Sequence, residues 1–469
     1  MNGNNVKALK SGIWYTAANF ITRSIGFITT PIFTRLLTHD EFGLYNNYTS
    51  WLSTFTILVT LNLSSTFISA RFDFEDDFDG YISSTLSLSV LSNLIWLLLI
   101  NLFSDLFVSF TGVEIRYLNI MMLYLIFHTA IEMFQTRERY YFEYKISVIT
   151  SLAVALCSSI LSVFLVLYMD NKLEGRIIGS SASQIFIGLG LLVLIYKKGR
   201  KINVSYWKYA LPICLPFIPH LLSLTLLNSM DKMMITRICG AEDNALYSVA
   251  YTCGAIITLL VTSLNTAFAP WLGEKLKEEK VDEIKTVSNK YILLFVFLSC
   301  GIMLVVPELL LIMGGNSYIE AKYVMPPVAF GCVCQFMYTL YVNIEQFKKK
   351  TMGMAIASMS AAGLNYILNA FLIPRFGYIA AAYTTLASFL WLLIAHMFLV
   401  NRLKLSNVYD NKRILLLILL MSIYTIGITF LYRNSFLRYT LIGLYAVVLV
   451  HFVIRNKQLI LTIVKKRKQ

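Results

Sequence analysis

The chain has 469 residues, of which 57% are hydrophobic and 14% are charged, and its formal net charge is +14. Apolar stretches long enough to cross a bilayer fill most of this length, which excludes a large soluble domain. The basic residues lie mainly in short loops between these stretches, a pattern typical of membrane topology and lipid headgroups rather than of nucleic-acid binding. We therefore expect an all-α polytopic membrane protein.

Fourteen membrane-spanning helices are predicted. In chain order they cover residues 11–34, 43–69, 81–103, 117–136, 147–169, 176–196, 209–238, 244–271, 290–313, 322–345, 351–373, 377–400, 413–432 and 438–454. Lys and Arg concentrate in alternate loops and in the tail Lys465-Lys466-Arg467-Lys468. Because basic loops stay on the cytoplasmic side, we expect both termini in the cytoplasm and the protein in the inner (cytoplasmic) membrane.

The first span carries a cation near the middle of the bilayer. Arg23 lies twelve residues before Arg35, hence about 18 Å from the outer boundary of a helix. Asn19, Arg23, Gly26 and Thr30 share one helical face. An ionisable residue at this depth indicates a functional site, and a guanidinium binds phosphate through two parallel hydrogen bonds. We interpret Arg23 as a pyrophosphate contact, with Asn19 and Thr30 beside it; the alternative is a structural ion pair with a carboxylate on a neighbouring helix.

Span four presents Tyr124, His128, Glu132 and Gln135 on one face. His128 and Glu132 are four residues apart, so they could relay a proton or bind a cation. Glu132 could instead neutralise Arg23 or be solvated near the cytoplasmic end. Both residues are candidates for coupling transport to an ion.

Spans seven and eight are also polar. Asn228, Asp231 and Lys232 lie in span seven, where Lys232 is a second cationic contact and Asp231 either pairs with Arg237 or Lys232 or carries a coupling ion. Three prolines in this span (Pro212, Pro216 and Pro219) predict a bent or locally unwound helix. Span eight carries hydroxyls and an amide at helical spacing, suited to sugar hydroxyls or to helix packing; the residues are Tyr247, Tyr251, Thr258 and Asn265.

The remaining ionisable groups carry weaker signals. Glu308 and Glu345 are expected at the membrane interfaces, and His396 is expected to be a packing residue. The acidic run between Asp73 and Asp79 is either a solvated loop or a partner of the basic loop at Lys275–Lys290. The seven cysteines have no ligand spacing, so we expect no disulfide framework, no metal and no cofactor.

The chain contains an internal repeat. Residues 34–45 and 236–247 share identical or acid-for-acid residues at six of twelve positions. The repeat predicts two six-helix bundles in parallel orientation around a central cavity, over residues 1–208 and 209–408, followed by two further helices and the basic tail over residues 409–469. Internal repeats of this kind are typical of transporters with a site between the halves.

Three passages resemble the Wzx-type oligosaccharide flippases of the multidrug/oligosaccharidyl-lipid/polysaccharide (MOP) superfamily. They are residues 35–45, residues 246–271 ending in Ala267-Phe268-Ala269-Pro270-Trp271, and residues 365–382 with Ile373-Pro374-Arg375-Phe376-Gly377. The resemblance covers essentially the whole chain. It implies a MATE-like fold and export of undecaprenyl-pyrophosphate-linked oligosaccharide repeat units for O-antigen, capsule or exopolysaccharide synthesis.

The flippase hypothesis implies alternating access without covalent chemistry, so we do not expect an enzyme. Its expected partners are the lipid-linked oligosaccharide, membrane lipids, H⁺ or Na⁺ as coupling ion, and the polysaccharide polymerase and chain-length machinery. Two other functions were weighed. A MATE-type multidrug/cation antiporter is disfavoured because Arg23 would repel cationic drugs. A membrane polysaccharide polymerase is disfavoured because the short outward loops lack a catalytic constellation.

Overall fold

The computed structural model describes residues 3–141, 143–200, 202–348, 350–403, 405 and 407–455. These residues form α-helices joined by short 3₁₀ turns, and no strand occurs in the described part of the chain. The prediction of an all-α polytopic protein is therefore confirmed.

The first half of the chain forms the elements α1 to α9. Their bounds are α1 Gly3–Leu36, α2 His39–Thr60, η1 Leu63–Thr66, α3 Phe67–Asp73, η2 Glu75–Asp77, α4 Phe78–Leu102, α5 Ser104–Thr111, α6 Ile115–Tyr140, α7 Tyr144–Tyr168, α8 Lys172–Gly199 and α9 Val204–Cys214.

The second half forms the elements η3 to α18. Their bounds are η3 Leu215–Phe217, α10 Ile218–Ile238, α11 Ala241–Lys277, α12 Val281–Leu304, α13 Val306–Gly314, η4 Asn316–Tyr323, α14 Met325–Phe347, α15 Thr351–Phe376, α16 Tyr378–Arg402, α17 Asn411–Leu431 and α18 Ser435–Arg455.

Ten of the described helices are long and apolar enough to cross a membrane, or eleven if α2 and its bent continuation form one span. Each of the fourteen expected ranges falls on a helix or on two consecutive helices. The count of fourteen spans itself stays a prediction.

Two of the expected spans depart from a regular α-helix. The segment after α2 turns by 50° at Leu61 and Asn62, which both adopt positive φ angles. In the expected span seven, the 3₁₀ turn η3 separates α9 from α10, and it contains Pro216. Proline removes a backbone donor and clashes with the preceding turn, which accounts for the change from α to 3₁₀ geometry here; the helix is interrupted but continuous, and no unwound segment occurs among its described residues.

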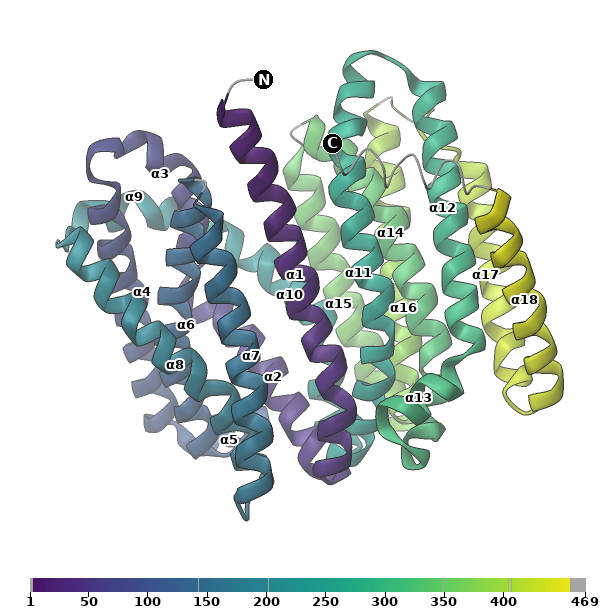
Figure 1. Cartoon of the computed structure of the whole chain (residues 1–469), viewed down its shortest axis with the longest axis horizontal. Coiled ribbons are helices and arrows are strands. Elements are labelled where there is room, and N and C mark those ends of the chain that lie inside the picture. Colours follow the sequence, from purple (N-terminus) through teal and green to yellow (C-terminus); the bar gives the residue numbers. More distant parts are fainter. Residues whose placement is uncertain are drawn as a thin grey trace.

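The helices lie in two groups side by side, with α4 to α8 in one group, α11 to α17 in the other and α1 between them (Figure 1). Helix α1 packs on α7 of the first group and on α11 and α13 of the second. Helix α9 packs on α4 and η1, whereas α10 packs on α15 and α2. The broken helix α9–η3–α10 therefore connects the two groups. The domain limits at residues 208 and 408 stay a prediction.

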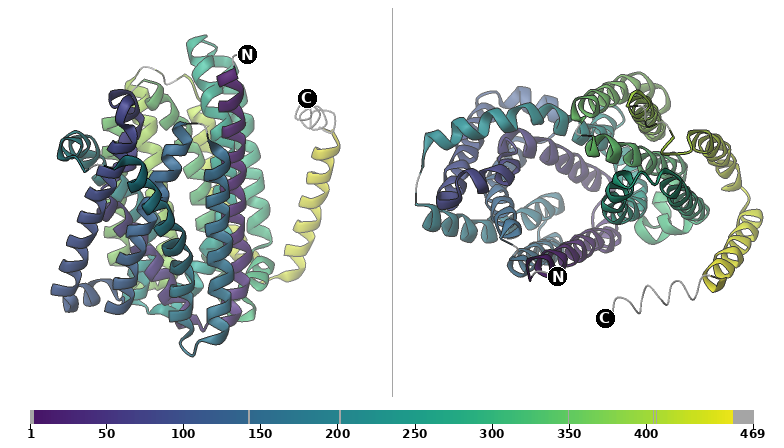
Figure 2. Two further views of the ribbon diagram at one scale, coloured as in Figure 1. Left: turned by 60° about the vertical axis from the view of Figure 1, so that its left-hand side comes forward. Right: turned by 90° about the horizontal axis from the view of Figure 1, so that it is seen from above.

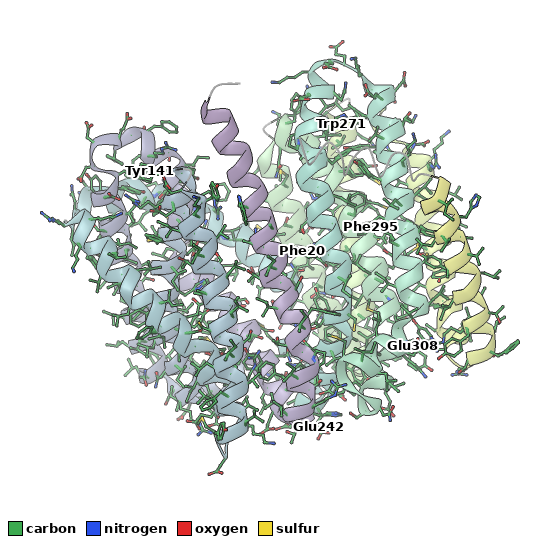
Figure 3. The ribbon with its side chains drawn as sticks, viewed as in Figure 1. Phe20, Tyr141, Glu242, Trp271, Phe295 and Glu308 are labelled. Carbon is green, nitrogen blue, oxygen red and sulfur yellow. The ribbon has the colours of Figure 1, made fainter. Side chains whose placement is uncertain are left out.

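The hydrophobic core is larger in the second group, where α14 is mostly buried and Phe295 of α12 stacks on Phe336 (Figure 3). Helix α18 lies at the periphery of the bundle (Figure 2). It is fastened by Arg438, which donates two hydrogen bonds to Glu308 of α13 at 2.5 and 2.6 Å. Glu308, which was expected at a membrane interface, thus anchors α18.

Candidate functional site

A cavity of about 510 Å³ lies between α1 and the second group of helices. Its wall comes from α1, α10, α11, α14 and α16. The lining residues are Arg23, Gly26, Phe27, Thr30, Asn228, Tyr251, Thr252, Ile256, Thr258, Val328, Cys332, Gln335, Thr385 and Phe389. Five of the nine residues expected to bind substrate are in this wall: Arg23, Thr30, Asn228, Tyr251 and Thr258.

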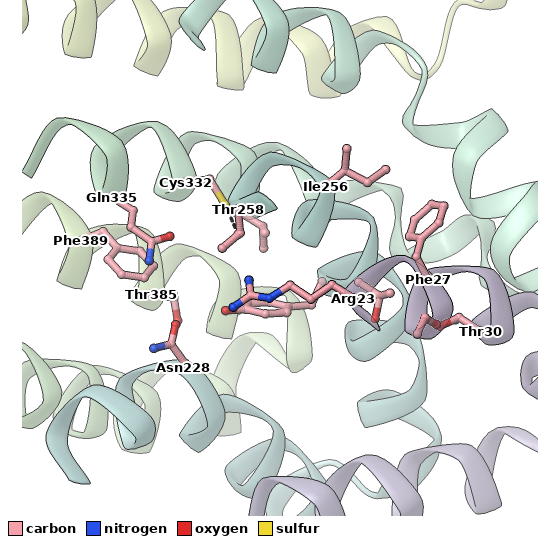
Figure 4. Close-up of a pocket in the computed structure, with 14 residues that line it drawn as sticks. Arg23, Phe27, Thr30, Asn228, Ile256, Thr258, Cys332, Gln335, Thr385 and Phe389 are labelled. Carbon is pink, nitrogen blue, oxygen red and sulfur yellow. Dashed lines mark hydrogen bonds between the residues drawn. The ribbon is translucent and has the colours of Figure 1, made fainter. Parts of the chain in front are cut away.

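Arg23 is the charged residue of this wall. Its side chain extends from α1 toward Thr385 and Asn228 on the far side (Figure 4). Among the described residues it forms no hydrogen bond and no ion pair with a carboxylate, and Glu132 instead accepts a hydrogen bond from Ser64. The five N–H donors of a guanidinium suit an anionic ligand, so the role of Arg23 as an anion contact stays a prediction.

The rest of the wall combines hydroxyls and an amide with aromatic rings. Thr258 lies 3.6 Å from the sulfur of Cys332, and Gln335 and Phe389 complete the same side (Figure 4). Hydroxyl and amide groups exchange hydrogen bonds with sugar hydroxyls, and rings offer apolar faces for stacking. None of the described lining residues is acidic.

Lys232 lies behind the wall. Its ammonium nitrogen is 5.2 Å from the centre of the Tyr251 ring, which itself lines the cavity. A cation over a ring face is stabilised by the ring quadrupole. Lys232 therefore adds positive potential from behind Tyr251. It was expected to contact the substrate directly, but it does not line the cavity.

Three other expected contacts lie outside the cavity. Asn19 is exposed on α1, and Tyr247 is fully buried with its hydroxyl directed to Asp231. Asn265 accepts a hydrogen bond of 2.7 Å from Asn343 of α14. The helical spacing placed Asn19 on the polar face of α1, and Tyr247 and Asn265 on the polar face of α11. A helix face is wider than the cavity, so residues at its edges lie outside the cavity or pack on neighbouring helices.

Asp231 is the centre of a buried polar cluster. It is 2% exposed and accepts hydrogen bonds from Tyr247 at 2.5 Å, from Asn369 at 2.7 Å and from Thr385. Asn365 accepts from Asn369 at 3.1 Å. Asp231 pairs with neither Arg237 nor Lys232 in the structure. Because Thr385 also lines the cavity, this cluster touches the cavity wall directly.

His128 and Glu132 do not form the expected relay. The His128 ring stacks on Tyr124 at 5.3 Å, and Glu132 accepts a hydrogen bond of 2.5 Å from Ser64 of η1. His128 contacts Tyr124 and Glu132 contacts Ser64, instead of each contacting the other. Their role in ion coupling stays a prediction that the geometry does not favour.

The acidic run does not reach the basic loop. Asp73 accepts from Tyr209 and Asp77 accepts from Tyr206, both on α9, while Asp79 pairs with Arg137 at 2.6 Å. Lys275 of the basic loop binds Glu278 and Glu283 locally. The run therefore holds α9 to the first group of helices.

Four hydrogen bonds between described residues join α1 and α2 to the second group, and all four lie where α1 runs into α2. They are Thr34 Oγ1 to the Met313 carbonyl at 2.6 Å, Arg35 to the Ile312 carbonyl at 3.1 Å, His39 to Ser317 at 3.0 Å and Asn244 to the Gly43 carbonyl at 2.9 Å. We call this region the closed end. Glu242 lies there, and Trp271 lies near the opposite end of α11 (Figure 3).

The two copies of the sequence repeat meet at the closed end. Gly43 of the first copy lies so close to Ala241 of the second that an added Cβ would be 1.8 Å from its carbonyl oxygen. The glycine is therefore required by backbone approach. The repeat identified in the sequence forms the contact between the two halves.

Sequence reasoning missed the cavity residues contributed by α14 and α16, which are Val328, Cys332, Gln335, Thr385 and Phe389. Those helices are apolar on most faces, so one polar residue per turn gave no stripe. Phe27 and Ile256 were missed because apolar side chains in a membrane helix carry no signal of a cavity.

The described helices form the apolar bundle of a multi-pass membrane protein, and the family models that match the chain place it among the transporters of the MOP superfamily. The model of the family described as "Polysaccharide biosynthesis protein" matches residues 8–276, more than half of the chain, and the chain belongs to this family. A second model, MatE, matches residues 216–371. The "Lsg locus putative protein 1" of Haemophilus influenzae is 22% identical over 362 residues, covering 72% of this chain and 84% of that protein.

Two solved structures share the fold. The lipid II flippase MurJ, in an inward closed conformation, has a TM-score of 0.72 at 14% identity and covers 96% of this chain and 100% of its own. An inward-facing MATE family transporter has a TM-score of 0.56 at 13% identity and covers 84% of this chain and 95% of its own. The chain thus belongs to the polysaccharide biosynthesis protein family and shares its fold with these transporters, as the sequence motifs predicted.

Proposed function

We propose that this transporter moves undecaprenyl-pyrophosphate-linked oligosaccharide repeat units from the cytoplasmic to the outer leaflet of the inner membrane. The product would serve synthesis of O-antigen, capsule or exopolysaccharide. The observation that carries the proposal is the unpaired guanidinium of Arg23 in the cavity, which lacks an acidic partner and is suited to a pyrophosphate.

The cavity wall supports a sugar-bearing headgroup. Thr30, Thr258, Gln335 and Asn228 supply donors and acceptors around Arg23. A cavity of about 510 Å³ holds part of a headgroup of several sugars, so the remaining sugars would extend between the two groups of helices. The polyprenyl chain stays in the lipid, because its transfer to water would cost about 0.8 kcal/mol per CH₂.

The closed end supports alternating access. With the predicted orientation, the α1–α2 junction faces outward, so this conformation is sealed on the outside. Opening it breaks four hydrogen bonds. The free energy of substrate binding must therefore favour the outward-open state enough to offset their loss. Asp231, linked to the wall through Thr385, is the residue we assign to a coupling H⁺ or Na⁺.

A cation antiporter is the second candidate in this fold, because MATE transporters share it. The cavity contradicts that function, since its described wall contains a cation and no carboxylate. A cationic drug would meet like charge in a medium of low dielectric constant, which is strongly unfavourable.

The direct experiment measures the lipid-linked intermediate. In cells depleted of this protein, surface polymer should fall and undecaprenyl-pyrophosphate-linked repeat units should accumulate on the cytoplasmic side. Wild-type protein should reverse both effects. Unchanged polymer together with unchanged intermediate after complete depletion would contradict the proposal.

A further inference from the structure

Besides Asp231 and Glu138, Glu345 is a buried acid, and it lies between α14 and α16. Glu345 and His396 are each 1% exposed, and Glu345 Oε1 is 2.8 Å from His396 Nδ1. The other carboxylate oxygen, Oε2, is buried and has no hydrogen-bond partner among the described residues. Glu345 was expected at an interface and His396 as a packing residue, and the structure shows instead a buried titratable pair.

We propose that Glu345 and His396 form a proton-binding site whose occupancy changes during transport. In the neutral pair one proton is shared between Nδ1 and Oε1. Release leaves a neutral imidazole and a carboxylate, and uptake restores the pair, so no other reactant is needed. The inference rests on the proposed transport function for its coupling role but stands on its own as a proton site.

The geometry is poor for a purely structural pair. A buried acceptor without a donor costs about 1–3 kcal/mol, and apolar residues of similar volume would pack the same space at lower cost. An ionised carboxylate needs hydrogen-bond donors on both of its oxygens. A carboxyl group that shares a proton through one oxygen tolerates the absence of a donor at the other oxygen. The unpartnered Oε2 is where water would bind when the site opens.

The site lies near the membrane face opposite the closed end. Glu345 is twenty residues after Met325, hence about 30 Å along α14 from its start beside η4. Helix α14 ends two residues later at Phe347, followed by Lys348 and Lys350. With the predicted orientation, a proton leaving the pair has a short path to the cytoplasm.

A row of stacked rings connects the pair to the cavity. His396 stacks on Tyr338 with ring centres 5.6 Å apart, and Tyr338 stacks on Phe389 at 6.3 Å, both at an interplanar angle of 16°. Phe389 lines the cavity. A substrate that displaces Phe389 would shift Tyr338 and thereby the imidazole.

The elements packed around the pair bring other titratable groups, none of which forms a described hydrogen bond or ion pair with it. On α14, α16 and the residues that follow each of them, these groups are Tyr338, Tyr341, Lys348, Lys350, Tyr378, Tyr383 and Arg402; on α15 and around the start of α17 they are Tyr366, Arg375, Tyr409, Asp410, Lys412 and Arg413. On α10 they are His220, Asp231, Lys232 and Arg237. On α11 and α12 they are Glu242, Asp243, Tyr247, Tyr251, Glu274, Lys275, Lys277, Asp282, Glu283, Lys285, Lys290 and Tyr291. Among them, Tyr338 contacts the imidazole through its ring.

The first test is infrared titration of the purified full-length protein in lipid nanodiscs. Wild type minus Glu345→Gln should show a carboxyl band that changes when the pH is varied from roughly 5 to 9. His396→Gln should alter this pH dependence, because it removes the imidazole with which the carboxyl group shares its proton. A band that stays constant over this range in wild type and in His396→Gln would overturn the proposal.

The second test adds farnesyl pyrophosphate, a short lipid pyrophosphate, in weak buffer with a pH-sensitive dye. Binding measured by calorimetry should be accompanied by a change of roughly one bound proton in wild type and none in Glu345→Gln. The exposed control Glu278→Gln should behave as wild type. Binding with the same proton change in Glu345→Gln would refute the coupling, whereas absence of binding to wild type would count against the proposed function instead.

Discussion

Arg23 is the residue on which the chemistry of the cavity depends. An intramembrane cation without a carboxylate is costly, and the fold keeps it unpaired between helices rich in hydroxyls. The sequence predicted this residue because one charge in an otherwise apolar helix stands out. It did not predict Thr385, Gln335 and Phe389 opposite it, since their helices show no polar periodicity.

Replacing Arg23 by Ala should abolish polymer export at unchanged protein level, whereas Arg23→Lys should keep partial activity because it retains the charge but loses the bidentate geometry. Surface polymer and the lipid-linked intermediate are measured together. The exposed Lys277→Ala is the matched control. Full export by the Ala variant would remove Arg23 from the mechanism.

Replacing Asp231 by Asn should change the dependence of transport on a proton or sodium gradient. The amide keeps the shape of the side chain but removes the charge that an ion would neutralise, so three donors lose an ionised acceptor. Transport into vesicles with imposed gradients measures the effect. A gradient response equal to that of wild type would assign Asp231 to structure alone.

At the scale of elements, the sequence located the helices well and their breaks partly. Three prolines predicted the interruption at η3, because proline has a fixed local effect. The turn at Leu61 and Asn62 was not predicted, since no proline or glycine marks it. The attachment of α9 to the first group was also missed, because it depends on the acidic run meeting Tyr206 and Tyr209 across space.

Replacing Gly43 by Ala should weaken the closed end, because the new methyl group meets the Ala241 backbone at 1.8 Å. Overpacking of this kind costs about 1–3 kcal/mol, so the outward-open population should rise several-fold. Labelling by an impermeant maleimide of a cysteine placed at Thr34, which is 7% exposed in the closed end, reports the opening in a background without the native cysteines. Gly190→Ala, where an added Cβ meets nothing within 4 Å, is the control that should leave labelling unchanged.

At the scale of the whole molecule, the proposed alternating access requires the two groups of helices to separate at the closed end. His39 and Ser317 lie on opposite sides of this contact, with their polar atoms 3.0 Å apart. The repeat predicted that two similar halves exist, but the contact between its two copies required the structure.

Cysteines at positions 39 and 317, in a background without the seven native cysteines, should be joined by a short bifunctional methanethiosulfonate reagent, and this cross-link should stop transport. Reduction should restore it, because the cross-link holds only one of the two conformations. A single His39→Cys variant controls for loss of the imidazole. Transport that continues at the wild-type rate in the fully cross-linked protein would argue against opening at this end.

The lone guanidinium has a thermodynamic consequence for the unloaded carrier. The site is open to solvent and cationic, so inorganic anions or acidic phospholipids should occupy it whenever cargo is scarce. Any such occupant that prefers the native state raises the melting temperature by mass action, by about 2.7 kcal/mol of added stability at a hundred times its dissociation constant. Purified material should therefore melt higher in pyrophosphate than in chloride, and this difference should vanish when Arg23 is removed.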